Sequence, residues 1–436
     1  MASAAATTSR PMPVPTRDGG VRVIGRANRY RRSRRSELVI WWREIDRVLL
    51  GLVMLLVVIG AIAVAAASPA SSHRLSTGAK SLGDLHFFWL HLRWLAVGLV
   101  TMFLASLLPK ETARRLAIGL AAAMIIGLVL VPLVGTEVKG ARRWLNVGIS
   151  LQPSEFLKPG FAIALAWILS WRVRDPKIPV MGISIGIMGL VGALLMAQPD
   201  FGSTVLFLAV WFVLVLLSGL SVRKIAVAAG GGVAVLVLAY LFYPNATHRI
   251  DAFLSGGSEF DQVDLAMRTL LNGGWGGTGL WLGTRKMALP EAHTDYIFSV
   301  IGEEFGLIMC GVIVLLYCAI VMRVLLRLLD EDDLFTVLAA AGLTAQLAGQ
   351  AFINILVNLQ LFPSKGMTLP LISYGGSSTI ALLLGVGFLL AITRRNPYLS
   401  RETFDPKERV ARPRLLKART RNEPRKEPRK EATEEP

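Results

Sequence analysis

Charged residues and cysteines are scarce in this chain. Only 18% of its 436 residues are charged, 53% are hydrophobic, and the mean hydropathy is +0.53. Soluble globular proteins carry about a quarter charged residues, so the composition excludes an ordinary soluble protein and indicates a membrane protein. The 2 cysteines, Cys310 and Cys318, lie in one apolar run. On one helix they would stand roughly 12 Å apart, which is too far for a disulfide.

Acidic residues are outnumbered by basic ones, 30 against 47, which gives a net charge of +17. The arginines flank apolar runs, so anionic lipid explains them with fewer assumptions than nucleic acid, which we do not expect as a partner. Residues 1–36 lack the apolar segment of a signal peptide, and we predict a disordered basic cytoplasmic tail over residues 1–45. We expect this tail to bind either anionic lipid or cytoplasmic proteins. Residues 398–436, with the repeat EPRKEPRKE, are predicted to be a second disordered cytoplasmic tail.

Residues 46–397, between these tails, contain ten apolar runs of about the 17 to 25 residues that a membrane-spanning helix needs. They predict an all-α polytopic membrane protein with about ten transmembrane helices. The expected spans are residues 48–68, 87–108, 115–135, 155–171, 179–197, 203–220, 224–243, 296–322, 335–359 and 377–393.

Short basic stretches predict the orientation, because Lys and Arg gather in cytoplasmic loops. All six stretches fall on one side of the expected spans; they contain Arg43, Arg47, Lys110, Arg114, Arg115, Arg172, Arg174, Lys177, Arg223, Lys224, Arg323, Arg327, Arg394 and Arg395. Both termini are then cytoplasmic. The long loop between the seventh and eighth spans, residues 244–295, is then extracytoplasmic.

Other basic residues lie in the predicted extracytoplasmic loops, against this bias, among them Arg142, Arg143 and Lys365. Cations gathered on that side suit an anionic ligand such as a lipid-linked diphosphate. For any single residue, contact with lipid headgroups is an equally good explanation.

Asp295 is the strongest candidate for a catalytic group. It stands where the eighth expected span begins, in LPEAHTDYIFSVIGEEFG (289–306), with Glu291 and His293 beside it. A carboxylate at the mouth of a span can act as a general base. From the residues alone, a helix N-cap is the alternative role.

Charged residues also occur inside the expected spans. Glu155 and Lys158 are three residues apart and can form an ion pair on one helix face. Glu303 and Glu304 lie within the eighth span, where we expect a protonated or partnered state.

A polar stripe runs along the ninth expected span, because Gln346, Gln350, Asn354 and Asn358 recur every four residues. Hydrogen bonding between helices and the lining of a cavity both explain such a stripe.

Two motifs look like a metal-binding pair and a phosphate-binding loop, but neither has the surrounding sequence that such a site needs. The acidic run at residues 330–333 has the spacing of a metal-binding pair, but it lies in a predicted cytoplasmic loop, where helix capping explains it. The glycines of GGWGGTG (273–279) do not end in a Lys-Ser/Thr pair, so they are not a phosphate-binding loop.

Five motifs, in order and at the predicted extracytoplasmic helix ends, resemble the SEDS family of bacterial shape, elongation, division and sporulation proteins. The motifs are GARRWLNVGISLQPSEFLKP (140–159), QPDFGST (198–204), RIDAFL (249–254), LPEAHTDYIF (289–298) and SKGMTLPLISYGGSS (364–378). The resemblance covers nearly all of residues 45–397. The GEE, SKG and long tails are similar to the division members rather than the elongation members.

This resemblance implies a ten-helix peptidoglycan glycosyltransferase of the bacterial inner membrane that works at the division site. Its substrate would be lipid II, an undecaprenyl-diphosphate disaccharide-pentapeptide. Its partners would be a class B penicillin-binding protein, which crosslinks the product, and other division proteins. The family's catalytic aspartate falls on Asp295.

The resemblance also implies further site residues. The motifs place Glu155, Lys158 and Asp200 among the residues needed for activity, and we add Lys365 and Ser377 as substrate-binding residues. We hypothesise that Asp295 takes the proton from the acceptor 4-hydroxyl while cations hold the diphosphates. Those cations are Lys158, Arg142, Arg143 and Lys365.

Alternatives stay open at this point. A divalent cation can replace some of the basic residues, and no metal ligands are predicted. A flippase that carries lipid II outward also suits ten spans with intramembrane charges. A scaffold that recruits a transpeptidase leaves Asp295 without a role.

Overall fold

The structure, a computed structural model, describes residues 13–15, 21–23, 34–76, 81–138, 141–146, 148, 150–243, 247, 250–251, 253–254, 262–363 and 366–395. The chain divides into a smaller unit, residues 1–44 and 394–436, and a larger unit, residues 45–393. Within the predicted N-terminal tail, strands β1 (Pro13–Pro15) and β2 (Val21–Val23) pair antiparallel, and α1 (Arg34–Glu44) is helical. The predicted C-terminal tail, residues 398–436, lies outside the described residues.

Ten apolar helices of the larger unit coincide with the ten expected spans. They are α2 (Arg47–Leu75), α3 (His86–Leu107), α4 (Lys110–Val134), α5 (Pro153–Arg174), α6 (Val180–Met196), α7 (Phe201–Leu217), α8 (Val222–Phe242), α11 (Ile297–Leu328), α12 (Leu334–Asn358) and α13 (Ser377–Ile392). In the described residues, 7 helices are long and apolar enough to cross a membrane, and α6, α7 and α13 are shorter apolar helices. The chain is a multi-pass, essentially all-helical membrane protein, as the sequence predicts.

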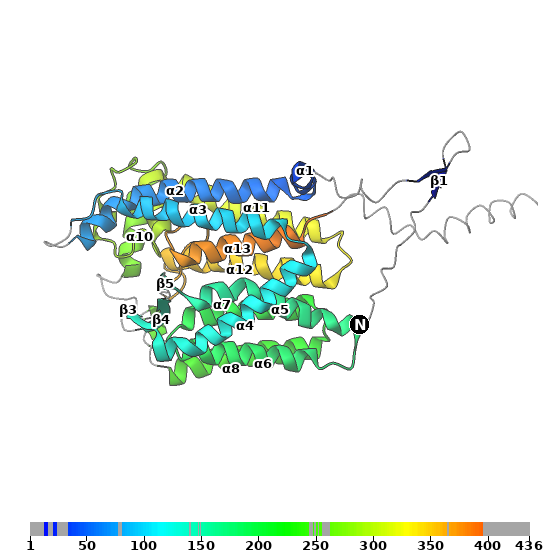
Figure 1. Cartoon of the computed structure of the whole chain (residues 1–436). Helices are drawn as coiled ribbons and strands as arrows, with labels where there is room; N and C mark the ends of the chain where they lie inside the picture. Colours follow the sequence, from blue (N-terminus) through cyan, green and yellow to red (C-terminus); the bar gives the residue numbers. More distant parts are fainter. Residues whose placement is uncertain are drawn as a thin grey trace, which may run out of the picture. The chain divides into compact units, whose positions relative to one another are not determined.

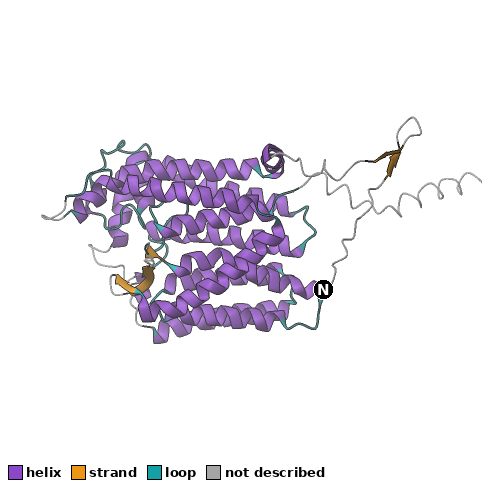
Figure 2. Ribbon diagram, in the orientation of Figure 1, coloured by secondary structure: helices purple, strands orange, loops and turns teal. Residues whose placement is uncertain are grey.

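The helices of this unit run side by side (Figure 1). At one end lie α10 (Gln262–Asn272) and the strands β3 (Thr136–Val138), β4 (Ala141–Asn146) and β5 (Ser150–Leu151), which form a small antiparallel sheet (Figure 2). A cavity opens here, so we call this end the cavity end. The opposite end carries Arg172 in the last turn of α5, Arg327 in the last turn of α11 and Arg323 one turn before it, and we call it the arginine end.

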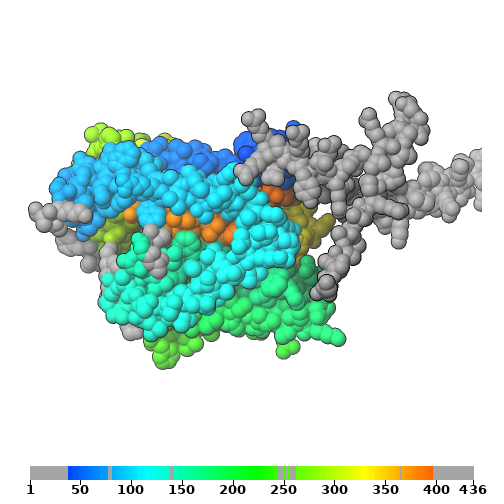
Figure 3. Space-filling model, viewed as in Figure 1, coloured from blue at the N-terminus to red at the C-terminus, as the bar shows by residue number. Residues whose placement is uncertain are grey.

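Helix α13 is the centre of the bundle. It packs against α3, α5 and α12, and nearly all of its residues are buried. A Cβ on Gly387 would lie only 2.7 Å from the Met102 carbonyl oxygen, so glycine is what lets α13 and α3 approach closely. In the space-filling view only a strip of orange α13 shows between its neighbours (Figure 3).

An ion cluster around Asp46 fastens the arginine end. Asp46 Oδ1 accepts from the backbone N–H groups of Val48 and Leu49 and so caps α2. Its Oδ2 lies 2.8 Å from both Arg323 Nε and Arg327 Nη1 of α11. Burial raises the pKa of Asp46, but the hydrogen bonds and charges of the two arginines and the Leu49 N–H outweigh it, so this pKa is below its ordinary value of 3.8.

Asp46→Asn is expected to lower the melting temperature at neutral pH, and this difference from wild type should disappear in acid. Since the folded pKa of Asp46 is lowered, the ionised carboxylate stabilises the fold fully above the unfolded value of about 3.8, and this contribution is lost as the pH falls through the lowered folded pKa. Melting curves in detergent should show a constant gap between wild type and variant from about pH 8 to pH 5, narrowing below about pH 3.8. A gap that persists unchanged in acid would show that the ion cluster is not its source.

The acidic run at residues 330–333 caps a helix, as the sequence predicts. Asp333 is the N-cap of α12, where it accepts from Phe335 N–H and from Thr336 Oγ1. Its Oδ2 lies 2.5 Å from Lys110 Nζ, which ties α12 to the start of α4.

Candidate active site

A cavity of about 600 Å³ opens at the cavity end of the membrane unit. Five predicted site residues line it together: Arg143, Glu155, Asp200, Asp295 and Ser377. The other lining residues are Trp94, Trp144, Ser150, Gln152, Ser203, Gln262, Glu291, Thr294, Tyr296, Gly366, Met367, Thr368, Tyr374, Gly375, Gly376 and Ser378. Segments far apart in the sequence therefore converge on one polar space.

Asp295 projects from a backbone that α12 holds. The Asp295 carbonyl oxygen accepts from Asn354 Nδ2 at 2.8 Å and from Asn358 Nδ2 at 3.2 Å. Asn354 Nδ2 also donates to the Met367 carbonyl at 2.7 Å. The polar stripe of α12 thus hydrogen-bonds the two segments that form one wall of the cavity. The N-cap of α11 is Tyr296, one residue after Asp295.

The residues just before Asp295 are fixed as well. His293 Nδ1 lies 2.6 Å from Ser71 Oγ of α2, and its ring packs on Phe87 of α3 with centroids 4.2 Å apart. Ser373 Oγ donates to the Thr294 carbonyl at 2.6 Å, and Tyr374 N–H donates to the His293 carbonyl at 3.0 Å. Three separate parts of the chain thus hold the backbone that carries Asp295.

Glu155 and Lys158 form the predicted ion pair. Lys158 Nζ lies 2.6 Å from Glu155 Oε1 and donates to Gln350 Oε1 at 2.9 Å. Lys158 is only 2% exposed and is not among the described residues that line the cavity, whereas its partner Glu155 is. Gln350 Nε2 donates onward to the Thr368 carbonyl at 3.0 Å.

Arg143 and Asp200 meet at the start of α7. Arg143 Nη1 lies 3.8 Å from Asp200 Oδ1, and the same guanidinium donates to the carbonyls of Gln198 and Pro199. Asp200 is the N-cap of α7 and accepts from Ser203 N–H at 3.2 Å. This pairing fastens the β4 strand to the helix bundle.

Arg142, another predicted cation, is not among the described residues that line the cavity. Arg142, in β4, lies 3.4 Å from Glu137 of β3, and its side chain is 53% exposed. Lys365 lies outside the described residues. A diphosphate-binding role for these cations stays a prediction.

Glu303 and Glu304 are partnered, as the sequence predicts. Glu303 accepts from the backbone N–H groups of Arg285 and Lys286 at 2.7 and 2.8 Å, and from Asn272 Nδ2 at 2.9 Å. Glu304 forms a buried ion pair with Lys286. These contacts hold the short 3-10 helix η2 (Arg285–Ala288) against α11. The chain that leads from η2 to Asp295 therefore starts from a fixed point.

Two glycines of GGWGGTG, Gly273 and Gly277, allow a close approach between the backbone of this loop and that of α11. A Cβ on Gly277 would lie 2.2 Å from the Glu304 carbonyl oxygen, and a Cβ on Gly306 would lie 2.2 Å from the Trp275 carbonyl oxygen. Gly306 interrupts α11 with φ +79°, a conformation that favours glycine. Larger residues at these positions would push the loop off α11.

Trp94 and Tyr374 are cavity residues for which the sequence offered no signal beyond their motif or apolar run. Burial raises the pKa of the Tyr374 hydroxyl, and a hydrogen bond with Trp94 partly opposes that shift. Among the described residues, no cluster of three or more His, Cys, Asp or Glu side chains is arranged to hold a metal ion.

Comparison with known proteins gives a consistent family. The family model described as "Cell cycle protein", that of FtsW, RodA and SpoVE, matches residues 46–398. A "Probable peptidoglycan glycosyltransferase FtsW" of Caulobacter vibrioides is 35% identical over 371 residues, covering 84% of this chain and 94% of that protein. A relative of the same name from Thioalkalivibrio sulfidiphilus is 35% identical over 370 residues, covering 81% and 91%.

Solved structures agree with this result. One, described as "Structural coordination of polymerization and crosslinking by a peptidoglycan synthase complex", superposes with a TM-score of 0.66 at 29% identity, covering 80% of this chain and 97% of that chain. The crystal structure of the Thermus thermophilus rod shape determining protein RodA gives a TM-score of 0.60 at 27% identity, covering 81% and 97%. The chain therefore belongs to the FtsW, RodA and SpoVE family of cell cycle proteins, the SEDS family that its motifs resemble.

Proposed function

We propose that this protein is a peptidoglycan glycosyltransferase that polymerises lipid II into β-1,4 glycan strands during cell division, with Asp295 as the general base. The observation that carries the proposal is the convergence of Asp295, Glu155 and Asp200 on one cavity at the end of the spans. The printed names of the relatives, peptidoglycan glycosyltransferases of the FtsW type, support the reaction class and the division role.

The reaction needs one base and a place for the leaving group. The Asp295 carboxylate takes the proton of the acceptor 4-hydroxyl. The electron pair that this leaves on the 4-oxygen forms a bond to the anomeric carbon of the donor. The bond from that carbon to the diphosphate breaks, and the lipid diphosphate leaves with its electron pair. Attack opposite an α-linked diphosphate inverts the centre and gives the β linkage. A positioned base of this kind contributes about 10²- to 10⁴-fold to the rate.

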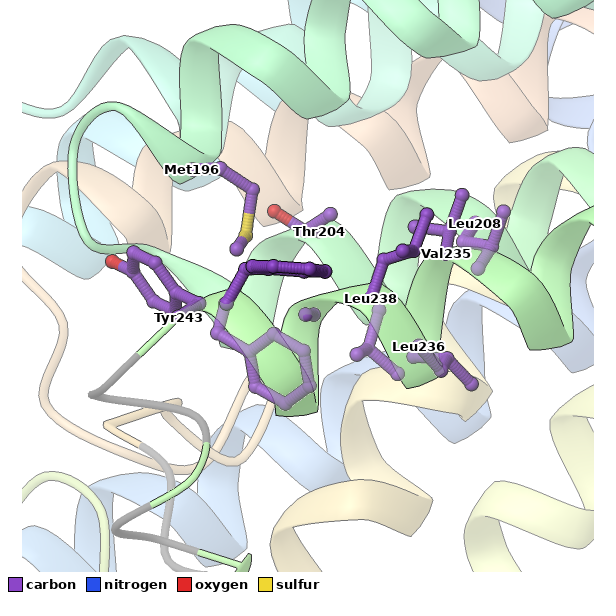
Figure 4. Close-up of a pocket in the computed structure, with 11 residues that line it drawn as sticks. Met196, Thr204, Leu208, Val235, Leu236, Leu238 and Tyr243 are labelled. Carbon is purple, nitrogen blue, oxygen red and sulfur yellow. The ribbon is translucent and has the colours of Figure 1, made fainter.

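An apolar pocket beside the cavity suits the lipid part of such a substrate. It has a volume of about 340 Å³ and lies between α7 and α8, with Met196, Thr204, Leu238 and Tyr243 among its lining residues (Figure 4). Thr204 directly follows Ser203, which lines the polar cavity. The first turn of α7 therefore separates an apolar space from a polar one, as an amphipathic lipid-linked sugar requires.

The location and partner follow from the same proposal. The basic residues at the arginine end favour a cytoplasmic position for that end, so the cavity faces the outside of the bacterial inner membrane at the division site. The partner is a class B penicillin-binding protein; a structurally similar chain comes from a complex described as coordinating polymerisation and crosslinking.

Purified lipid II offered in detergent is the direct test of the reaction. With its matched class B penicillin-binding protein, the protein is expected to make long glycan, because polymerisation needs no membrane to cross. A protein that makes no glycan in detergent, yet moves labelled lipid II between the leaflets of vesicles, would be a flippase instead.

A further inference from the structure

Besides α10, whose first residue is Gln262 and whose first turn carries Asp264, four helices begin at the cavity, and their N-termini carry partial positive charge. Three of them already have a carboxylate of the chain at or beside that end. Glu155 lies in the first turn of α5, Asp200 caps α7, and Asp295 stands two residues before α11. These three ends therefore hold an anion supplied by the protein itself.

The fourth helix, α13, begins differently. Its N-cap is Gly376, at φ +57°, which has no side chain to accept a hydrogen bond, and its first turn contains no acidic residue. Gly375, Gly376, Ser377 and Ser378 all line the cavity. The N–H groups of Ser378 and Thr379 bond back to Gly375 and Gly376, but within the described residues no acceptor takes the N–H of Gly376 or Ser377. Two backbone donors are thus available at this end.

The side chain of Ser378 gives an independent indication. The residue is only 6% exposed, and it lines the cavity. Its hydroxyl oxygen is buried and has no hydrogen-bond partner among the described residues. Buried hydroxyl groups in folded proteins are nearly always paired, so a polar ligand at this point would satisfy it.

The charges of the cavity show what kind of ligand fits. Among the described residues, its lining carries four carboxylates, Glu155, Asp200, Glu291 and Asp295, and one cation, Arg143, which is held by Asp200 and two carbonyls. Lys158 is paired with Glu155. Within the described part of the lining, the N-terminus of α13 therefore offers positive charge without an acidic partner of its own.

We propose that the N-terminus of α13, residues 375–378, binds the diphosphate of the lipid-linked substrate through the Gly376 and Ser377 N–H groups and the Ser378 hydroxyl. Helix N-termini are common binding sites for phosphates. Here the site adjoins the Asp295 segment, since Tyr374 donates to the His293 carbonyl and Ser373 to that of Thr294. Donors at this place stabilise the charge that grows on the departing diphosphate. This inference rests on the proposed function.

Ser377→Asp is the sharpest test, with Ser377→Asn as its matched control. An aspartate in the first turn of a helix favours folding, so the variant should melt no lower than wild type while its carboxylate fills the anion site. The full-length protein in nanodiscs of zwitterionic lipid is titrated with undecaprenyl diphosphate, which has no sugar to transfer, and with inorganic diphosphate. We expect Ser377→Asp to weaken undecaprenyl diphosphate binding at least about tenfold more than Ser377→Asn does, because the two side chains have nearly the same size and only aspartate adds a negative charge.

The outcomes are separable. Wild-type affinity in Ser377→Asp overturns the inference. If that variant folds poorly, Ser378→Ala decides: weakening of about threefold or more supports the site, and unchanged binding overturns it. If inorganic diphosphate competes with undecaprenyl diphosphate, the site recognises the diphosphate group itself. If undecaprenyl diphosphate binds and inorganic diphosphate does not compete, the site recognises only the lipid-linked form. Diphosphate binding without any glycan synthesis would refute the proposed function and leave the site standing.

Discussion

Replacing Asp295 with asparagine is expected to reduce glycan polymerisation by about 10²- to 10⁴-fold without loss of the fold. The amide has the shape of the carboxylate but cannot accept the proton of the acceptor hydroxyl. The backbone of this residue is held through its carbonyl by Asn354 and Asn358, and these bonds do not depend on the side chain. The measurement is glycan length and yield from purified lipid II with equal amounts of folded protein.

Asp175→Asn is the matched control for this experiment. Asp175 follows α5 at the arginine end, is exposed, and undergoes the same chemical change far from the cavity. It should polymerise as wild type does. Wild-type polymer from Asp295→Asn would remove Asp295 from its proposed role as the base, whatever the reaction turns out to be.

Lys158→Met is expected to have the largest effect on stability. It leaves the Glu155 carboxylate, which is 9% exposed, without its cation. Removing one partner of a buried ion pair costs about 3 to 5 kcal/mol, because the remaining charge is desolvated and uncompensated. Thermal unfolding in detergent should show a clear fall in melting temperature, and pulse proteolysis should show faster cleavage.

The double variant Lys158→Met with Glu155→Gln separates charge from packing. Since no buried charge remains, it should recover a large part of the lost stability. It should not recover activity, because Glu155 lines the proposed site. If Lys158→Met alone were as stable as wild type, the pair would carry little of the energy assigned to it here.

The spans could be predicted from the sequence because lipid imposes a strict length and composition on a crossing helix. Helix α2 runs on to Leu75, past the expected end near residue 68, because its last turns pack against protein: Ala70, Ser71 and Ser72 are buried. The ion pair of Glu155 and Lys158 was also predictable, since residues three apart share a helix face.

The long-range contacts of the site could not be predicted in this way. Lys158 and its partner Gln350 are 192 residues apart, and no spacing rule connects them. Trp94 lies in an apolar run, where nothing distinguishes a cavity residue from a lipid-facing one. The small sheet β3–β5 carries Arg143 to Asp200, and strands of two to six residues are too short to show a periodic pattern.

The way in which Asp295 is held has a practical consequence. Asn354 and Asn358 donate hydrogen bonds to its carbonyl, while Ser373 and Tyr374 donate to the carbonyls of the two residues before it. These contacts therefore do not depend on the Asp295 carboxylate, which is the proposed base. We therefore expect Asp295→Asn to keep its shape, so that the donor and acceptor lipids of the proposed reaction can be captured side by side in a stalled complex and imaged before any bond is made.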